Sequence, residues 1–270
     1  MKSITFYLRE FDMSAKITFL GTSFCLGVPV VGCKCDVCVS KNKKNKRLRP
    51  SILLELEGKK ILVDVAPDFR EQALKHQIND IDALFLTHAH YDHVAGFDDL
   101  RVFFYLNDKK IPCILSEDTL KSLKKTFHYL FKGKSNQTVD DIRMDMKVLE
   151  NDFGDFDLFN KKFRYFSYFQ ENAKVNGFKI NNFAYVTDIK KYTDELVDEL
   201  MDIDTLVISA PLEEPTNSHF GFEDVLSFSR EVKAKKTIIT HISHFIDHEK
   251  VMKKLPKDFS IAYDSMEIIL

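Results

Sequence analysis

The most informative stretch of this sequence is Thr87-His88-Ala89-His90-Tyr91-Asp92-His93, which holds four side chains able to bind metal within six residues. It follows a short apolar run that we predict to be a buried strand. Where a strand ends and the chain turns, side chains two residues apart can face the same way, so His88 and His90 can share one metal ion. Asp92 and His93 can serve a second ion on the other side of the turn. This pattern favours a metal centre over a solvated histidine-rich loop.

The rest of the chain alternates between strand and helix patterns, and no Pro-rich or Gly-rich linker divides it. Apolar runs that end at turn residues predict strands, with a β-hairpin around Gly58, at residues 17–20, 52–57, 61–65, 83–86, 111–115, 163–169, 178–180, 183–186, 205–209 and 236–240. Helical periodicity predicts helices at residues 68–76, 95–105, 117–131, 190–201, 222–232 and 247–255. The polar, acidic segment 132–162 predicts no element. We therefore expect an α/β fold, a single domain of two packed sheets flanked by helices over residues 16–270, after an N-terminal extension of residues 1–15 in which Met13 could be an alternative start.

Composition excludes several classes of protein. The chain has 39 Lys and Arg against 41 Asp and Glu, a net charge of −2, and so lacks the basic excess of a general nucleic-acid coat protein. No apolar run approaches the roughly 20 residues that span a bilayer, and the first residues are too charged for a signal peptide. The sequence therefore predicts a cytoplasmic protein without a membrane partner.

Three of the five cysteines crowd into GCKCDVC as Cys33, Cys35 and Cys38. This spacing suits a disulfide framework poorly, and in a reducing compartment such clusters more often bind metal. Tetrahedral zinc needs a fourth ligand from elsewhere, and reduced buried thiols or a redox pair are the alternatives. Cys25 and Cys113 lie in apolar settings that are typical of small core residues.

The sequence HxHxDH, followed by Gly96, resembles the signature of the metallo-β-lactamase superfamily. The resemblance implies an αββα sandwich with a one- or two-metal site at the edge of its sheets. It also implies that Asp188 in FAYVTD bridges two metals, that His241 in IITHISH completes the second site, and that Asp64 in ILVDVAPDFR orients the metal histidines from behind. A plain turn residue remains an alternative for Asp64, and a helix N-cap remains one for Asp188.

The cysteine segment resembles that of the subgroup around the PhnP-like phosphoribosyl cyclic phosphodiesterase. There a histidine three residues after the last metal histidine completes a structural zinc site, which implies a site of Cys33, Cys35, Cys38 and His244. The subgroup also carries a histidine in a PxxxH-type segment that reaches the substrate phosphate or leaving group, and His219 in EEPTNSHFGF matches it. A solvent-facing histidine beside a helix start is the alternative for His219.

Three other histidines fit no motif, and we expect them at the surface: His76, His128 and His248.

One position departs from the superfamily pattern. Where another metal histidine is usual, counting back from Gly177 places Gln170. Its carbonyl oxygen is a neutral ligand that usually binds zinc more weakly than imidazole does. Either the first site is weakened and prefers an ion such as Mn²⁺, with Glu171 as a possible substitute ligand, or the protein is a one-metal or inactive relative.

The resemblance implies a metal-dependent phosphodiesterase acting on a small cyclic phosphate or a nucleotide-like phosphodiester. One or two catalytic divalent ions, Zn or Mn, would supply the attacking hydroxide, with Asp92 and His219 as catalytic residues and one structural Zn at the cysteines. Three other functions stay open: a pyrroloquinoline quinone biosynthesis protein B-like role, an RNA-processing nuclease, and a zinc-stabilised binding protein that Gln170 has made catalytically impaired. The basic run 41–49, KNKKNKRLR, slightly favours RNA, but a solvated loop is the simpler interpretation of it. A β-lactamase is less favoured, because a cytosolic protein cannot protect a periplasmic target.

Overall fold

The computed structural model describes residues 15–107, 109–131 and 143–270. Most of the predicted extension, residues 1–14, and part of the unassigned segment, residues 132–142, lie outside this description. In the described residues no helix is long and apolar enough to cross a membrane.

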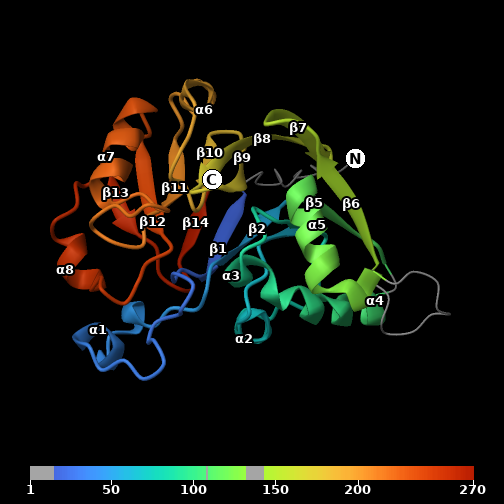
Figure 1. The fold of residues 1–270 in the computed structure, drawn as a ribbon, viewed down its shortest axis with the longest axis horizontal. Coiled ribbons are helices and arrows are strands. Elements are labelled where there is room, and N and C mark those ends of the chain that lie inside the picture. Colours follow the sequence, from blue (N-terminus) through green and yellow to red (C-terminus); the bar gives the residue numbers. More distant parts are fainter. Residues whose placement is uncertain (1–14, 108, 132–142) are drawn as a thin grey trace, which may run out of the picture.

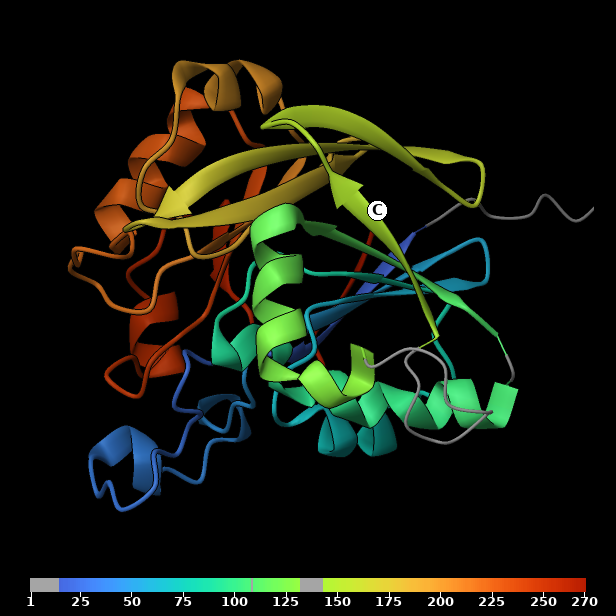
Figure 2. The same ribbon diagram turned by 45° about the vertical axis from the view of Figure 1, so that its right-hand side comes forward.

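Two seven-stranded sheets form the centre of the fold (Figure 1; Figure 2). The first sheet has the order β14 (Glu267–Ile269), β1 (Lys16–Gly21), β2 (Ser51–Leu56), β3 (Lys59–Val63), β4 (Ala83–Phe85), β5 (Ile111–Ser116) and β6 (Met144–Leu149). The second has the order β13 (Phe259–Ile261), β12 (Lys236–Thr240), β11 (Thr205–Ser209), β10 (Phe183–Val186), β9 (Ala173–Ile180), β8 (Lys161–Gln170) and β7 (Phe153–Leu158). Both sheets mix parallel and antiparallel pairs.

Helices lie beside both sheets. Those beside the first are α2 (Phe69–Lys75), α3 (Tyr91–Val94), α4 (Arg101–Asn107) and α5 (Glu117–Thr126), with 3₁₀ turns at Ala95–Leu100 and His128–Phe131. Those beside the second are α6 (Asp194–Glu199), α7 (Phe222–Glu231) and α8 (His248–Met252). A short helix α1 (Asp36–Val39) and a 3₁₀ turn at Lys43–Asn45 precede β2. The predicted αββα sandwich of the α/β class is therefore confirmed.

Apolar residues on both faces of the central strands create this layering. In β8, Phe163 and Tyr165 pack between the two sheets, whereas Phe166 and Tyr168 pack under the helices of the second sheet. Because successive side chains of a strand point to opposite faces, each face receives its own apolar pair. A strand of this kind must be covered on both sides, and the helices provide the outer cover.

Most predicted elements are confirmed, and the differences have local causes. The hairpin around Gly58 joins β2 and β3, and Gly58 takes a φ of +77° that glycine adopts readily. The helices predicted at 95–105 and 117–131 each contain a 3₁₀ turn, and the described part of segment 132–162 forms β6 and β7. Their strands alternate exposed and partly buried residues, so they lack the apolar runs by which the other strands were found.

The basic run 41–49 is only in part the solvated loop that we predicted: Lys41 and Lys43 are exposed, but Asn45 and Arg47 are buried. Arg47 donates hydrogen bonds to Thr22 Oγ1 (2.8 Å) and to the carbonyl of Ala262, and its Nη2 lies 3.2 Å from His248 Nδ1. His248 is therefore buried too, and the prediction of a surface position for it was wrong. This part of the basic run is a structural connection to the C-terminal segment.

A substitution at Gly96 tests how tightly the segment after His93 packs against the segment that follows β3. A Cβ atom at Gly96 would lie 2.3 Å from the carbonyl oxygen of Ala66 and 2.9 Å from Phe69 Cβ. We expect Gly96→Ala to lower the free energy of unfolding by about 1–3 kcal/mol, as overpacking of a tight core does. Chemical denaturation measures this, with the exposed α2 substitution Glu71→Ala as the control that changes stability by less than about 0.5 kcal/mol. Equal stability of the two variants would contradict the proposed contact.

Candidate metal centre

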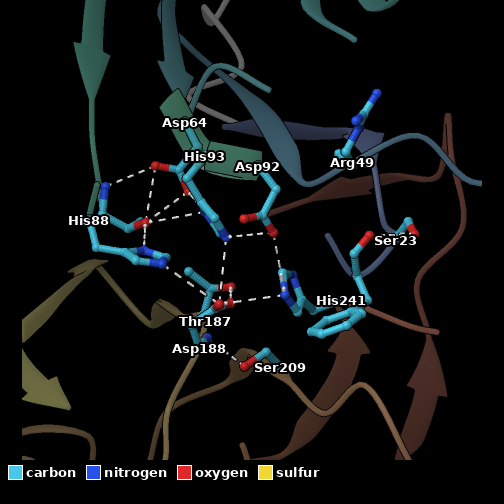
Figure 3. A network of polar contacts seen from close by, with 12 residues as sticks. Ser23, Arg49, Asp64, His88, Asp92, His93, Thr187, Asp188, Ser209 and His241 are labelled. Carbon is cyan, nitrogen blue, oxygen red and sulfur yellow. Dashed lines mark hydrogen bonds and ion pairs between the residues drawn. The ribbon is translucent and has the colours of Figure 1, made fainter. Parts of the chain in front are cut away.

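The metal-binding side chains meet where several strands end. His88, Asp92 and His93 follow β4, Asp188 follows β10, and His241 follows β12 (Figure 3). All five are buried, with Asp92 the most exposed at 5%. Residues up to 153 positions apart in the chain therefore lie at one end of the sandwich.

Asp92 and Asp188 both lie close to His93 and His241. Asp92 Oδ2 lies 3.4 Å from His93 Nε2 and 3.7 Å from His241 Nε2. Asp188 Oδ2 lies 3.6 Å from His93 Nε2 and 3.5 Å from His241 Nε2. Asp92, His93 and His241 form one close group of possible ligand atoms, and His88, His93 and Asp188 form another, so each group of three is a candidate site for a divalent cation.

The Nδ1 atoms of His93 and His88, which face away from the candidate metal site, have hydrogen-bond partners of their own. His93 Nδ1 donates to Asp64 Oδ2 over 2.7 Å, and His88 Nδ1 lies 3.0 Å from the hydroxyl of Thr87, which also contacts Asp64. The Nε2 atoms of His88 and His93 are buried without a hydrogen-bond partner. A buried polar atom without a partner is costly, and a bound cation would satisfy both nitrogens.

Asp64 follows β3 with a φ of +58°, and its Oδ2 atom accepts the Nδ1–H of His93. Asp188 does not cap α6, whose N-cap is Thr193.

Electrostatics keep Asp188 and His88 in the protonation states that metal binding needs. For His93, burial by itself would lower the pKa, but the carboxylates of Asp92, Asp64 and Asp188 raise it well above its usual value. Burial by itself would raise the pKa of Asp188, but His241 and His93 beside it lower that pKa well below its usual range. Burial, with His93 close by, lowers the pKa of His88 well below its usual value. An ionised carboxylate and a neutral imidazole are the forms that act as ligands.

Three residues of the centre have strained backbone. Asp64, Asp188 and His241 have φ values of +58°, +57° and +68°. Residues other than glycine in this left-handed region cost of order 1–3 kcal/mol each, and they persist only where the surrounding structure fixes them. These three residues lie just after β3, β10 and β12, beside the candidate centre.

His90 and Gln170 are placed differently from Asp92, His93, Asp188 and His241. The His90 ring packs edge-on to that of His88 at 4.5 Å, but among the described residues it belongs to no group of three ligand atoms within 4.8 Å of one another. Gln170, the last residue of β8, turns its amide nitrogen toward Asp188 Oδ2 (3.2 Å) and His219 Nε2 (2.8 Å). Its carbonyl oxygen is buried without a partner.

His219 is 3% exposed, so the alternative of a solvent-facing histidine is wrong. Its ring nitrogen forms a further close group with Asp188 and His241.

The centre opens into a cavity of about 490 Å³. Its lining contains Phe24, Cys25, His90, Tyr91, Asp92, Gln170, Glu171, Asn172, Ala173, Asp188, Ser218 and His219. Phe24 packs edge-on to the rings of His219 and His241, at 5.6 and 5.4 Å. The sequence analysis did not identify Phe24 as a residue of the site, and it placed Cys25 in the core. Both residues follow β1, which ends at Gly21, and this position after a strand end was the signal that could have placed them at the cavity. Cys113, in contrast, is a core residue as predicted.

The cysteine cluster is a second candidate metal site. The Nδ1 atom of His244 lies 3.3, 3.5 and 3.5 Å from the sulfurs of Cys33, Cys35 and Cys38. A sulfur and a nitrogen bound to the same tetrahedral zinc are about 3.6 Å apart, so the four residues fit that ion. The backbone N–H of Cys38 lowers the pKa of the Cys35 thiol to about 6, which favours the thiolate. The cluster joins the segment of α1 to the loop that carries His241, three residues before His244.

Comparison with known proteins agrees with this geometry. The family described as "Beta-lactamase superfamily domain" matches residues 59–242. The chain is 31% identical over 256 residues to a protein of Porphyromonas gingivalis named octanoyltransferase, a match that covers 93% of this chain and 51% of that protein. It therefore spans about half the length of this curated relative.

Solved structures share the whole fold. A diphosphatase from the PhnP family superposes with a TM-score of 0.88 at 32% identity, over 96% of this chain and 98% of that one. Zn²⁺-bound PqqB from Methylobacterium extorquens superposes with a TM-score of 0.73 at 17% identity, over 94% and 100% of the two chains, and shows likeness of fold only. The chain thus belongs to the metallo-β-lactamase superfamily, as a hydrolase of the PhnP-like type.

Proposed function

We propose that this hydrolase is a metal-dependent phosphodiesterase that acts on a small cyclic phosphate or a nucleotide-like phosphodiester. The observation that carries the proposal is the close group of Asp92, His93 and His241, with Asp188 Oδ2 3.5–3.6 Å from both histidines. Asp92 and Asp188 border a cavity of about 490 Å³. The likeness to a PhnP-family diphosphatase supports the choice of a phosphate ester. All cysteines of the chain are free thiols, which suits the reducing cytosol in which we place the enzyme.

In this proposal the four residues hold a Zn²⁺ or Mn²⁺ ion. Such an ion, when bound, lowers the pKa of water and polarises a phosphoryl oxygen. Asp64 fixes the tautomer of His93 through Nδ1, so that Nε2 is free to act as ligand. Asp92, besides serving as ligand, borders the cavity where the reacting phosphate would lie.

His219 is the protein's own candidate for contact with the phosphate or the leaving oxygen. It borders the cavity, and its backbone N–H donates to Thr216 Oγ1 over 3.0 Å, which fixes its loop. Phe24 covers the rings of His219 and His241 and limits the access of water to them.

An RNA substrate is less well supported. The basic run that favoured it contributes Arg47 and Asn45 to the protein interior instead of to a surface.

Hydrolysis of bis(p-nitrophenyl) phosphate tests the proposed function. With added Mn²⁺ or Zn²⁺ we expect turnover, and we expect Asp92→Ala to reduce it by about 100-fold or more, because the cation loses a charged ligand that also borders the cavity. Glu71→Ala, on the exposed side of α2, is the matched control and should keep its activity. A folded, metal-loaded protein without turnover for either ion would favour a binding protein.

Asp64, which accepts the Nδ1–H of His93, gives a separate prediction about metal affinity. Asp64→Asn replaces the charged acceptor of the His93 Nδ1–H, and we expect affinity for the catalytic ion to fall by roughly 10–100-fold. Competition with a fluorescent chelator measures this affinity. Asp82→Asn, which also removes a carboxylate that accepts a backbone N–H but lies at Lys60, should leave it unchanged. Equal affinities in all three proteins would refute the orienting role.

We further propose that Cys33, Cys35, Cys38 and His244 hold a structural zinc ion. Cys35→Ser should then lose one zinc per chain and unfold at a lower temperature, since zinc binding would contribute to folding. Elemental analysis and thermal denaturation measure the two effects. Cys25→Ser is the matched control, because Cys25 lies at the cavity, outside the cluster. A Cys35→Ser protein with unchanged zinc content and melting temperature would exclude the site.

A further inference from the structure

Tyr91 places an exposed aromatic ring at the cavity that borders the candidate metal centre. It is the first residue of α3, between His90 and Asp92, and it lines the cavity although it is 70% exposed. Consecutive Cα atoms are about 3.8 Å apart, so the ring starts one residue away from a carboxylate of the centre. Single exposed aromatic residues are common on protein surfaces. The position of this one beside a possible phosphate site is what calls for an explanation.

The faces of the Tyr91 ring are open to a ligand. Phe24, the phenylalanine of the same cavity, already packs edge-on to the rings of His219 and His241. Within residues 15–107, 109–131 and 143–270, no ring packs on Tyr91 and its hydroxyl takes part in no hydrogen bond. An open aromatic face at a binding cavity is suited to a flat, conjugated group.

Two polar side chains of the same cavity are also unoccupied by the protein. Glu171 and Asn172 form the two-residue turn between β8 and β9, and both are exposed and line the cavity. In the described part of the chain neither side chain has a hydrogen bond or an ion pair. A carboxylate accepts hydrogen bonds, and an amide both donates and accepts them. Such a pair matches the mixed donors and acceptors on the edge of a nucleobase.

Backbone hydrogen bonds fix this turn relative to the one that carries Tyr91. The N–H of Asn176 in β9 donates to the carbonyl of Thr87 over 2.9 Å, which joins the hairpin to the start of the metal-binding turn. On the other side of the hairpin, Phe169 and Lys191 exchange two hydrogen bonds of 2.9 Å. A ligand therefore meets groups that are already in place, and this lowers the entropy lost on binding.

We propose that the cavity takes a nucleotide-like phosphodiester whose base packs on the Tyr91 ring, with the edge of the base at Glu171 and Asn172. The inference rests on the proposed function and narrows its substrate, because a small cyclic phosphate without a base would leave all three side chains unused. The cavity of about 490 Å³ lies within the roughly 300–1,000 Å³ of pockets that enclose drug-sized ligands, a class that includes a mononucleotide. Stacking accepts any base, since every base has a π face.

The binding of two ligands, one with a base and one without, tests the proposal independently of turnover. Adenosine 5′-monophosphate and ribose 5-phosphate share the phosphate and the sugar, and calorimetric titration of the metal-loaded, full-length protein measures both dissociation constants. We expect the wild type to bind the nucleotide about 10-fold or more tightly, and Tyr91→Ala to lose this preference, because the stack is lost. Tyr91→Phe keeps the ring and should keep the preference. Asn172→Ala should weaken only the nucleotide, by about 2- to 10-fold, through loss of one hydrogen bond.

Tyr105→Ala is the matched control, because Tyr105 is also 70% exposed but lies on α4, outside the lining of the cavity. It should bind both ligands as the wild type does. Equal binding of the two ligands by the wild type would overturn the proposal, and so would a preference that persists in Tyr91→Ala or disappears in Tyr91→Phe. A loss of affinity for both ligands alike in Tyr91→Ala would overturn it too, since a base platform affects only the nucleotide.

Hydrolysis separates this result from the proposed function. Adenosine 2′,3′-cyclic phosphate and methyl riboside 2′,3′-cyclic phosphate contain the same reacting diester. We expect Tyr91→Ala to raise KM for the adenosine ester about 10-fold with little change in kcat, and to leave the riboside ester unchanged. Equal kcat/KM for both esters in the wild type would reject only the base platform. Base-dependent binding without hydrolysis of any diester would reject only the phosphodiesterase activity.

Discussion

The buried carboxylate of Asp188 is the interaction on which the rest of the centre depends. A charge taken out of water is costly unless positive groups or donors surround it. Its Oδ2 atom faces His88, His93, His241 and Gln170, and its Oδ1 atom accepts a hydrogen bond from Thr187 over 2.8 Å. The sandwich brings these groups to one oxygen from the ends of several strands. Both the protonation states and the metal-binding capacity of the centre follow from that convergence.

A second constraint fixes the segment that carries His241. His244 in this segment meets the three cysteines, and His248 meets Arg47, which is itself buried. Asn45 accepts the backbone N–H of His248 and donates to Asp247, so the basic run and the cysteine segment both bind the same loop. Two connections of different chemistry therefore position one candidate metal ligand, His241. The strained φ of His241 is tolerated because these connections leave its loop little freedom.

The two sides of the centre differ in what the fold supplies. The side of Asp92 has charged and imidazole ligands with Asp64 behind His93, whereas the opposite side has the neutral amide of Gln170 in contact with His219. The cavity borders Asp92 and Asp188 as well as Gln170 and His219. Gln170, at the end of β8, contacts both Asp188 and His219, and the sandwich around it is that of the superfamily.

Local sequence was sufficient for the chemistry that lies close together in the chain. The α/β sandwich, the hairpin at Gly58 and the ligand types in residues 87–93 follow from strand periodicity and from metal chemistry, which act over a few residues. Tertiary structure alone decided that Arg47 and His248 are buried and that Cys25 and Phe24 face the cavity. It also decided that Gln170 presents its nitrogen to Asp188 and that His90 stands apart from the compact ligand groups. These outcomes depend on contacts between residues far apart in the chain, and the energy of burying a polar group is set by partners that periodicity does not encode.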